Sequence, residues 1–234
     1  FQNPHRRDGW IKWGFSPVRT MAWGSLRFEP KWAEINRKIC PPFDPGSAFK
    51  DKFKIVFMQF QKEYNLVNEK VFKALQDISK IKGIALAVKD ATREGKEYFD
   101  KRKVSGDLGD SLIGWYGNEV HSPALIEWAD CIIVIGGSIG IEAILQRKYV
   151  IYPTFLNSNE TMYEYFDAAF CAKSIDEISA LIEKLKSGVK LNRPAGEGRL
   201  LKEILYAGKE EFDVSLRYYE NISQDKLSFV QEQN

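Results

Sequence analysis

The sequence predicts an α/β fold: a doubly wound, Rossmann-like parallel sheet with helices on both faces, preceded by an irregular segment rich in Trp and Pro. Two observations lead to this prediction. Short, almost wholly apolar stretches, such as CIIVI at 131–135, are typical of strands buried on both faces of a sheet. These stretches alternate along the chain with segments of helical periodicity, which is the pattern of successive βαβ units.

The composition is that of an ordinary globular protein. Hydrophobic residues make up 44% of the 234 residues and charged residues 28%, which excludes disordered and low-complexity classes. The net charge of +2 argues against a nucleic-acid partner, because such proteins present a broad positive surface. The length fits one main domain with an appendage. We expect an irregular segment or remnant of a partner domain at 1–50, an α/β domain at 51–222 and a polar tail at 223–234.

The segment 1–50 is rich in aromatic residues and has little sustained periodicity. It contains four of the six Trp and six of the nine Pro. Only 30–39 is predicted as a helix, because Pro30 suits a first turn and the run CPP at 40–42 ends it. Two interpretations of the Trp residues are open: a surface on which sugars stack and, as the favoured one, hydrophobic packing.

Strands and helices alternate from residue 53 onward. Apolar and β-branched stretches at 53–60, 83–89 and 112–115 are predicted as strands. Between the first two strands, apolar residues at 67, 71, 75 and 78 recur at helical spacing. The charged stretch that follows the second strand, up to 103, is predicted as a solvated loop and helix.

The second half of the chain continues this alternation. Strands are predicted at 131–135, 149–152 and 170–172, and helices at 124–129, at 141–146 and, as a pair, at 197–220. Ser122 and Pro123 are expected to supply the N-cap and the first-turn proline of the helix at 124–129. Ser174 and Glu177 have the spacing of a capping box, and a helix with one apolar face follows them.

The glycine-rich turn at 136–140 is the strongest candidate for a ligand site, because ligands of doubly wound sheets bind beyond the carboxyl ends of the strands. Backbone N–H groups of Gly137, Ser138 and Gly140, together with the helix dipole, favour a phosphate. Glu142 is placed to accept two hydrogen bonds from the vicinal hydroxyls of a ribose. The alternative is that the glycines only permit close packing and that Glu142 is a solvated acid that suits the dipole.

The loop at 156–161 is the second candidate. Side chains of Asn159 and Thr161 are suited to bind sugar hydroxyls without bringing a charge. The favoured alternative for Asn159 is that it caps the helix that begins near Met162.

Basic residues follow the strand at 83–89. Lys89 and Arg93 are candidates to neutralise a diphosphate or a carboxylated sugar, with a charged surface loop as the alternative for both. His121 is a candidate acid or base, although a capping or surface role is favoured. No catalytic residue is assigned.

Neither a metal site nor a membrane span is expected. The three Cys are widely spaced and only two His are present, a pattern that suits reduced thiols in the cytoplasm. The most apolar stretch, 124–145, is interrupted by three acidic residues and cannot form a spanning helix.

The run SPALIEWADCIIVIGGSIGIEAILQRKYVIYPTFLNSNETMYEYF at 122–166 resembles the donor-binding, C-terminal half of GT-B glycosyltransferases. It is similar to transferases of surface-carbohydrate and capsule biosynthesis, and more distantly to nucleotide-sugar 2-epimerases. The resemblance rests on the order of elements: a short helix ending in WAD, an apolar strand, a Gly-Ser turn, Glu142-Ala143, the strand KYVI and an Asn-rich loop. In such transferases the turn binds the donor phosphates, and a glutamate at the place of Glu142 holds the ribose. Their basic loop often continues with His-Pro, where Asp90-Ala91 stands here.

The resemblance implies metal-independent transfer of a sugar from a nucleotide-sugar donor to a glycan or lipid-linked acceptor in surface polysaccharide synthesis. No cofactor is expected, and the cytoplasm is the expected location, with association with the inner face of a membrane as an option. A non-catalytic nucleotide-sugar-binding or regulatory module and a 2-epimerase stay open as alternatives. A GT-B enzyme has two sheets of similar size, so we expect this chain, which starts without Met, to supply one donor-type sheet and at most a remnant of the other.

Overall fold

The computed structural model describes residues 4–58, 68–90 and 108–231. Two compact units are present: residues 36–197 form one, and residues 1–35 together with 198–234 form the other. The predicted boundaries at residues 50 and 222 stay predictions.

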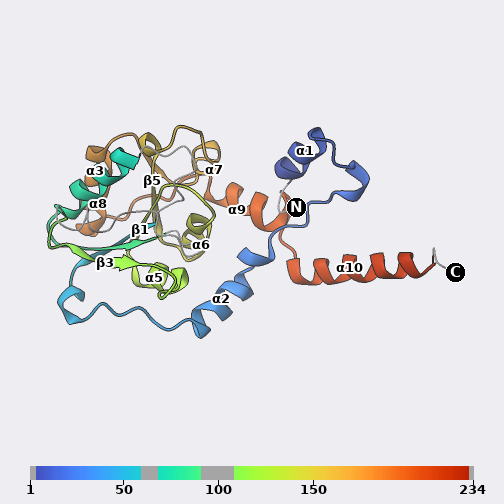
Figure 1. Ribbon diagram of the computed structural model, residues 1–234, viewed down its shortest axis with the longest axis horizontal. Helices are drawn as coiled ribbons and strands as arrows, with labels where there is room; N and C mark the ends of the chain where they lie inside the picture. The colour runs from blue at the N-terminus through green and yellow to red at the C-terminus, as the bar shows by residue number, and fades with distance from the viewer. Residues whose placement is uncertain (1–3, 59–67, 91–107, 232–234) are drawn as a thin grey trace. The chain divides into compact units, whose positions relative to one another are not determined.

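The unit of residues 36–197 is built on a six-stranded parallel sheet (Figure 1). The strand order is β3-β2-β1-β4-β5-β6, and every neighbouring pair is parallel. The predicted class, a doubly wound α/β fold, is therefore confirmed. The strands are β1 (Phe53–Met58), β2 (Ile84–Lys89), β3 (Leu112–Tyr116), β4 (Cys131–Val134), β5 (Tyr149–Pro153) and β6 (Phe170–Ala172).

Helices cover both faces of this sheet. Helices α3 and α8 contact each other over one face, and α5 and α6 contact each other over the opposite face (Figure 1). The helices of this unit are α3 (Asn68–Ser79), α5 (Ser122–Trp128), α6 (Ile139–Leu145), α7 (Met162–Tyr165) and α8 (Ile175–Lys186), with the short 3-10 turns η3 (Ser47–Phe49) and η4 (Thr154–Leu156).

The continuous apolar character of the strands is explained by burial on both faces. Ile55 and Phe57 of β1 belong to the cluster that packs against α3 and α8, together with Leu75 and Ile182 of those helices. Val56, which alternation places on the other face, is equally inaccessible. Each such side chain contributes about 1.5–3 kcal/mol on burial.

Two helix starts differ in detail from the prediction. The N-cap of α5 is His121, whose backbone oxygen accepts hydrogen bonds from the N–H groups of Ala124 (3.1 Å) and Leu125 (3.3 Å), so the expected cap Ser122 is wrong and is instead the first helical residue. At α8, Ser174 caps as expected, accepting from Glu177 N–H at 3.2 Å. The Glu177 carboxylate, however, accepts from the N–H of Lys173 at 2.7 Å, one residue before the cap.

The unit of residues 1–35 and 198–234 joins the two ends of the chain. It contains α1 (Pro4–Lys12), the 3-10 turns η1 (Pro17–Arg19) and η2 (Leu26–Phe28), the start of α2 (Pro30–Ile39), most of α9 (Glu197–Tyr206) and α10 (Val214–Gln231). Helix α2 has the predicted bounds, whereas α1 was not predicted, and none of its residues is buried.

Close backbone contacts hold this unit together. The N–H of Ser25 donates to the oxygen of Leu205 at 3.1 Å, and the Tyr218 hydroxyl donates to the oxygen of Gly24 at 3.2 Å. The rings of Trp23 and Tyr218 meet edge to face at 5.0 Å. The packing role expected for the Trp residues therefore holds for Trp23, while Trp13 is 82% exposed.

Candidate functional site

The candidate site lies at the carboxyl ends of the central strands of the sheet. The strand order reverses between β1 and β4, and doubly wound sheets open a crevice at this switch point. The connection from β4 to α6 borders it. The segments that follow β1 and β2, at 59–67 and 91–107, lie outside the described residues.

The connection between β4 and α6, residues 135–138, ends in three small residues, at 136–138. Gly137 has φ +76°, in the left-handed region where a side chain is disfavoured. Ser138 is the N-cap of α6 without a side-chain capping bond, and its oxygen accepts from Ile141 N–H at 3.1 Å. Gly137 and Ser138 are half-buried. The first N–H groups of α6 thus start beside a partly accessible turn, as an anion site requires.

Tyr163 of α7 supports this turn through a hydrogen bond. Its hydroxyl donates to the oxygen of Gly137 at 2.6 Å, and the side chain is inaccessible to solvent. Burial raises the pKa of Tyr163, opposed by the backbone N–H groups of Gly140 and Ile141. A Cβ atom on Gly140 would lie 2.3 Å from the tyrosine oxygen. Gly140 is therefore required for close packing, whatever else it contacts.

Glu142 lies in the first turn of α6 and is half-buried. It lies four residues after Ser138 in the sequence, so about one helical turn separates it from the accessible part of the turn at Gly137 and Ser138. Its role as an acceptor for ribose hydroxyls stays a prediction.

The loop after β5 is tied to this turn at a second point. The side-chain amide of Asn157 donates to the oxygen of Ile135 at 3.5 Å. Its side-chain oxygen accepts from Asn159 N–H at 3.0 Å. Together with the bond from Tyr163 to Gly137, this contact fixes the loops after β4 and β5 to each other.

The expected capping role of Asn159 is wrong. Thr161 is the N-cap of α7 and forms a capping box with Glu164, whose carboxylate accepts from Thr161 N–H at 3.1 Å. Asn159 is exposed two residues earlier. The physical reason is that Glu164, three residues after Thr161, accepts the Thr161 backbone N–H, and an N-cap at Asn159 would lack this reciprocal bond.

Lys89 ends β2 and is buried, with 9% of its surface exposed. Its ammonium donates to the oxygen of Gly117, which follows β3. Burial lowers the pKa of Lys89, and the nearby carboxylates of Glu119 and Asp90 oppose this shift. Lys89 thus lies at the predicted edge of the sheet, but its ammonium is held by the protein itself.

Of the two remaining candidates, Arg93 is not described and His121 is on the surface. Arg93 falls among residues 91–107 and is not described. His121 is exposed at the start of α5, in the surface and capping position that was favoured for it.

The described ranges also bear on metal-ligand clusters, cysteine chemistry and possible membrane spans. They hold no group of three or more His, Cys, Asp or Glu side chains able to bind a metal ion. The three cysteines are free thiols, and burial raises the pKa of Cys171 to about 11, so it stays protonated at neutral pH. Across these same ranges, no helix is both long enough and apolar enough to cross a membrane.

Comparison with known proteins gives a fold but no sequence family. No protein-family model and no curated protein sequence matches this chain. Among solved structures, the chain is similar to sucrose-phosphate synthase from Thermosynechococcus elongatus, with 14% identity and a TM-score of 0.55 over 97% of this chain and 58% of the other. A putative UDP-N-acetylglucosamine 2-epimerase from Listeria monocytogenes matches with 11% identity and a TM-score of 0.56, over 86% and 56% of the two chains.

A third similar structure is HepE of Anabaena in complex with UDP-glucose, with 10% identity and a TM-score of 0.51, over 95% of this chain and 62% of the other. The chain has the fold of one half of a GT-B protein. This confirms, at the level of fold, the resemblance predicted from residues 122–166. The GT-B half described here spans 56% to 62% of the length of these three structures.

Sequence reasoning missed Tyr163 and Asn157, which hold the site together. Asn157 lies within the loop that was predicted to carry ligand contacts, so its position was indicated but not its role. Tyr163 contacts a turn 26 residues away. The one signal in the sequence was that Tyr163 follows Asn159, a predicted ligand contact, by four residues.

Proposed function

We propose that this chain is the donor-binding half of a glycosyltransferase that uses a nucleotide-sugar. One observation supports it above all: a half-buried Gly-Ser turn with Glu142 behind it lies at the switch point of a GT-B half. Structures of the same fold include HepE with UDP-glucose and an Escherichia coli trehalose-6-phosphate protein with UDP-2-fluoro glucose.

We assign the phosphates, the ribose and the sugar of the donor to different residues of the site. Backbone N–H groups of Gly137 and Ser138 would face its phosphates, while Gly140, whose N–H is directed at the Tyr163 hydroxyl, would let the start of α6 pack closely at this turn. Glu142 would accept hydrogen bonds from the two ribose hydroxyls. Asn159 and Thr161 would bind sugar hydroxyls. Lys89 and Arg93 would add positive charge near the diphosphate.

The reaction breaks the bond between the anomeric carbon and a phosphate oxygen, and it forms a bond from that carbon to an acceptor hydroxyl. Negative charge then grows on the departing nucleoside diphosphate. Fixed amide dipoles stabilise this charge without reorganising, so transfer proceeds without a metal. The acceptor is a glycan or lipid-linked sugar of surface polysaccharide synthesis, reached in the cytoplasm at the inner face of a membrane, and the group that takes the acceptor proton belongs to a second half.

A calorimetric titration with UDP-, GDP- and CMP-sugars tests the donor site. We expect one of them to bind, and Glu142→Gln to weaken it about tenfold to a hundredfold, because each hydrogen bond to a charged acceptor is worth about 1.5–3 kcal/mol. Glu127→Gln, an exposed glutamate on α5, is the matched control and should bind as the unmodified chain does. Absence of binding for all three donor classes would overturn the proposal.

A 2-epimerase is the second candidate, because the Listeria protein named as a putative UDP-N-acetylglucosamine 2-epimerase shares the fold. Incubation with UDP-N-acetylglucosamine and analysis of the sugar released would reveal an inverted configuration at C2. Tight binding without any turnover, also in the presence of acceptor sugars, would favour a non-catalytic nucleotide-sugar-binding module.

A further inference from the structure

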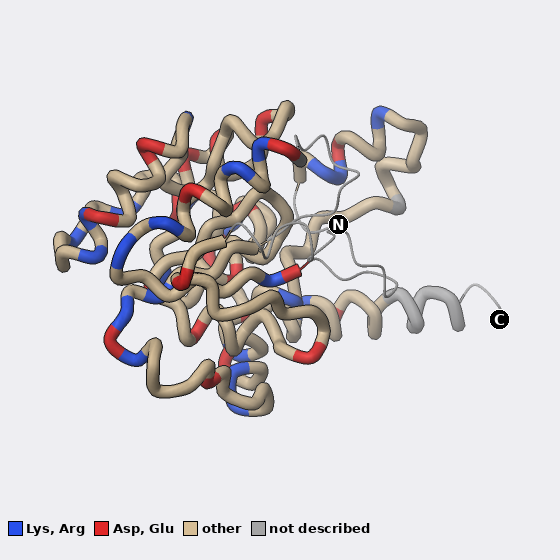
Figure 2. The backbone as a smooth tube through the Cα atoms, turned by 60° about the vertical axis from the view of Figure 1, so that its left-hand side comes forward, with Lys and Arg blue, Asp and Glu red and all other residues tan. Residues whose placement is uncertain are grey.

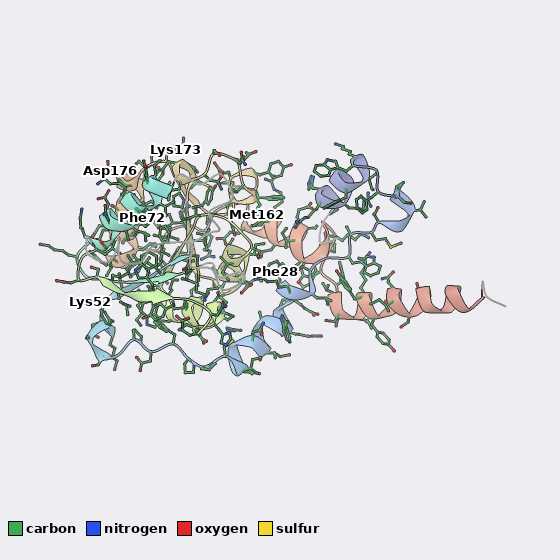
Figure 3. The ribbon with its side chains drawn as sticks, viewed as in Figure 1. Phe28, Lys52, Phe72, Met162, Lys173 and Asp176 are labelled. Carbon is green, nitrogen blue, oxygen red and sulfur yellow. The ribbon has the colours of Figure 1, made fainter. Side chains whose placement is uncertain are left out.

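A second groove lies at the amino ends of the strands, opposite the candidate donor site. It has a volume of about 720 Å³ and is lined by three segments: 50–54 at the start of β1, 147–149 before β5, and 185–190 at the end of α8. Gly83, Ala129 and Asp130 complete it. Figure 3 shows Lys52, from the first segment, and Met162, from α7 beside the candidate donor site, at opposite ends of this unit.

The groove concentrates positive charge. Basic and acidic positions are interspersed over most of the backbone (Figure 2), and the whole chain has a net charge of only +2. The groove alone combines seven cationic side chains with two carboxylates. The cations are Lys50, Lys52, Lys54, Arg147, Lys148, Lys186 and Lys190, and the carboxylates are Asp51 and Asp130.

Two of the cations have a structural role. The Lys148 ammonium donates to the backbone oxygens of Glu127 at 2.8 Å and Ala129 at 2.7 Å, where α5 ends. The Lys186 ammonium donates to the oxygen of Lys82 and to the Glu183 carboxylate, both at 2.7 Å. Cations at helix carboxyl ends satisfy free carbonyls and suit the helix dipole, so these two lysines require no ligand.

The other five cations have no such explanation. Within the part of the chain that the structure describes, the side chains of Lys50, Lys52, Lys54, Arg147 and Lys190 form no ion pair and no hydrogen bond. One of the two carboxylates is also engaged, because Asp130 accepts the backbone N–H of Lys54 at 2.8 Å. Like charges gathered in one groove repel one another, and this repulsion reduces the stability of the folded chain. A bound anion would remove that repulsion.

We propose that this groove binds a ligand carrying several phosphate groups, supplied either by a soluble polyphosphorylated molecule or by a lipid headgroup. Ammonium groups on flexible stems bind phosphate as point charges, and here they extend from three separate segments around one concave surface. The site is distinct from the donor site, because it lies at the opposite edge of the same sheet. It stands whether or not the chain binds a nucleotide-sugar.

Two probes separate the two sources of phosphate: inorganic tripolyphosphate, and vesicles of phosphatidylcholine with and without phosphatidic acid. The full chain should bind at least one of them, more weakly as salt increases. The triple variant Lys50→Gln/Lys52→Gln/Lys190→Gln removes three exposed cations, and we expect about a hundredfold weaker binding, from about 1 kcal/mol per cation at a phosphate surface. Lys173→Gln, which changes an exposed lysine outside the groove, should bind as before.

The outcome assigns the source or overturns the site. Binding to tripolyphosphate alone indicates a soluble ligand, and binding to the anionic vesicles alone indicates a lipid headgroup. The triple variant should unfold at the same urea concentration as the unmodified chain, or a higher one, because it relieves repulsion. The proposal fails if neither probe binds, or if the triple variant and Lys173→Gln lose binding equally. It also fails if the triple variant keeps full binding, which would place the anion elsewhere, such as at the turn after β4.

Discussion

Removing the hydroxyl of Tyr163 would show how firmly the turn between β4 and α6 is held. Tyr163→Phe deletes a buried donor that lies 2.6 Å from the oxygen of Gly137, while the ring continues to pack against Gly140. A neutral hydrogen bond contributes about 0.5–1.5 kcal/mol, and a carbonyl left without its donor adds part of a desolvation cost. Gly137 is half-buried, so we count only part of that desolvation cost. We therefore expect a loss of about 1–2 kcal/mol in the free energy of unfolding.

Urea unfolding measures this loss, with an unchanged dependence on urea because the folded surface stays the same. Tyr219→Phe is the matched control, since the Tyr219 side chain is 71% exposed and should cost less than about 0.5 kcal/mol. If the turn also binds a donor phosphate, Tyr163→Phe should weaken UDP more than uridine. Equal stability of the two variants would refute the reasoning that Tyr163 supports the turn.

Two further predictions concern backbone packing and alkaline pH. Gly24→Ala should cost about 2 kcal/mol more in urea unfolding than Gly188→Ala: both glycines have positive φ, but only at Gly24 would a Cβ meet an atom, the oxygen of Leu205 at 2.0 Å. Equal costs would contradict this contact. Burial raises the pKa of Tyr152 to about 12, against about 10 when unfolded, so this group's contribution to stability is intact below pH ~10 and is lost as the pH rises through about 12. Ultraviolet titration of tyrosinate in the folded chain should show it ionising after the exposed tyrosines, and a single transition near pH ~10 would speak against it.

Local patterns predicted most of the fold correctly. Helix α2 was predicted with its observed bounds, because a proline at the first turn and a Cys-Pro-Pro run at the end leave little choice. The strands β1, β2, β4 and β5 were predicted because burial on both faces demands apolar side chains at every position. The N-cap of α7 was predicted at Asn159 and lies at Thr161, although the capping-box spacing from Thr161 to Glu164 was visible in the sequence.

Contacts between distant segments could not be predicted in this way. The bond between Tyr163 and Gly137 depends on two loops meeting after two separate strands, and no periodicity encodes that. Helix α1 has no buried residue, so the amphipathic pattern that reveals other helices is missing. The pairing of residues 1–35 with residues 198–234 joins the ends of the chain, and only long-range backbone contacts reveal it.

This pairing of the two chain ends also sets an order of events during synthesis. The backbone partner of Ser25 is Leu205, and the partner of the Gly24 oxygen is Tyr218. Translation adds about 5–20 residues per second, so Leu205 and Tyr218 leave the ribosome many seconds after the aromatic residues of segment 1–35. The strands of the sheet, all between residues 53 and 172, emerge in that interval. Residues 1–35 are therefore made before the sheet but gain their backbone partners only after it, and during that interval the side chain of Trp13, 82% exposed even in the folded chain, is a surface that a chaperone could bind.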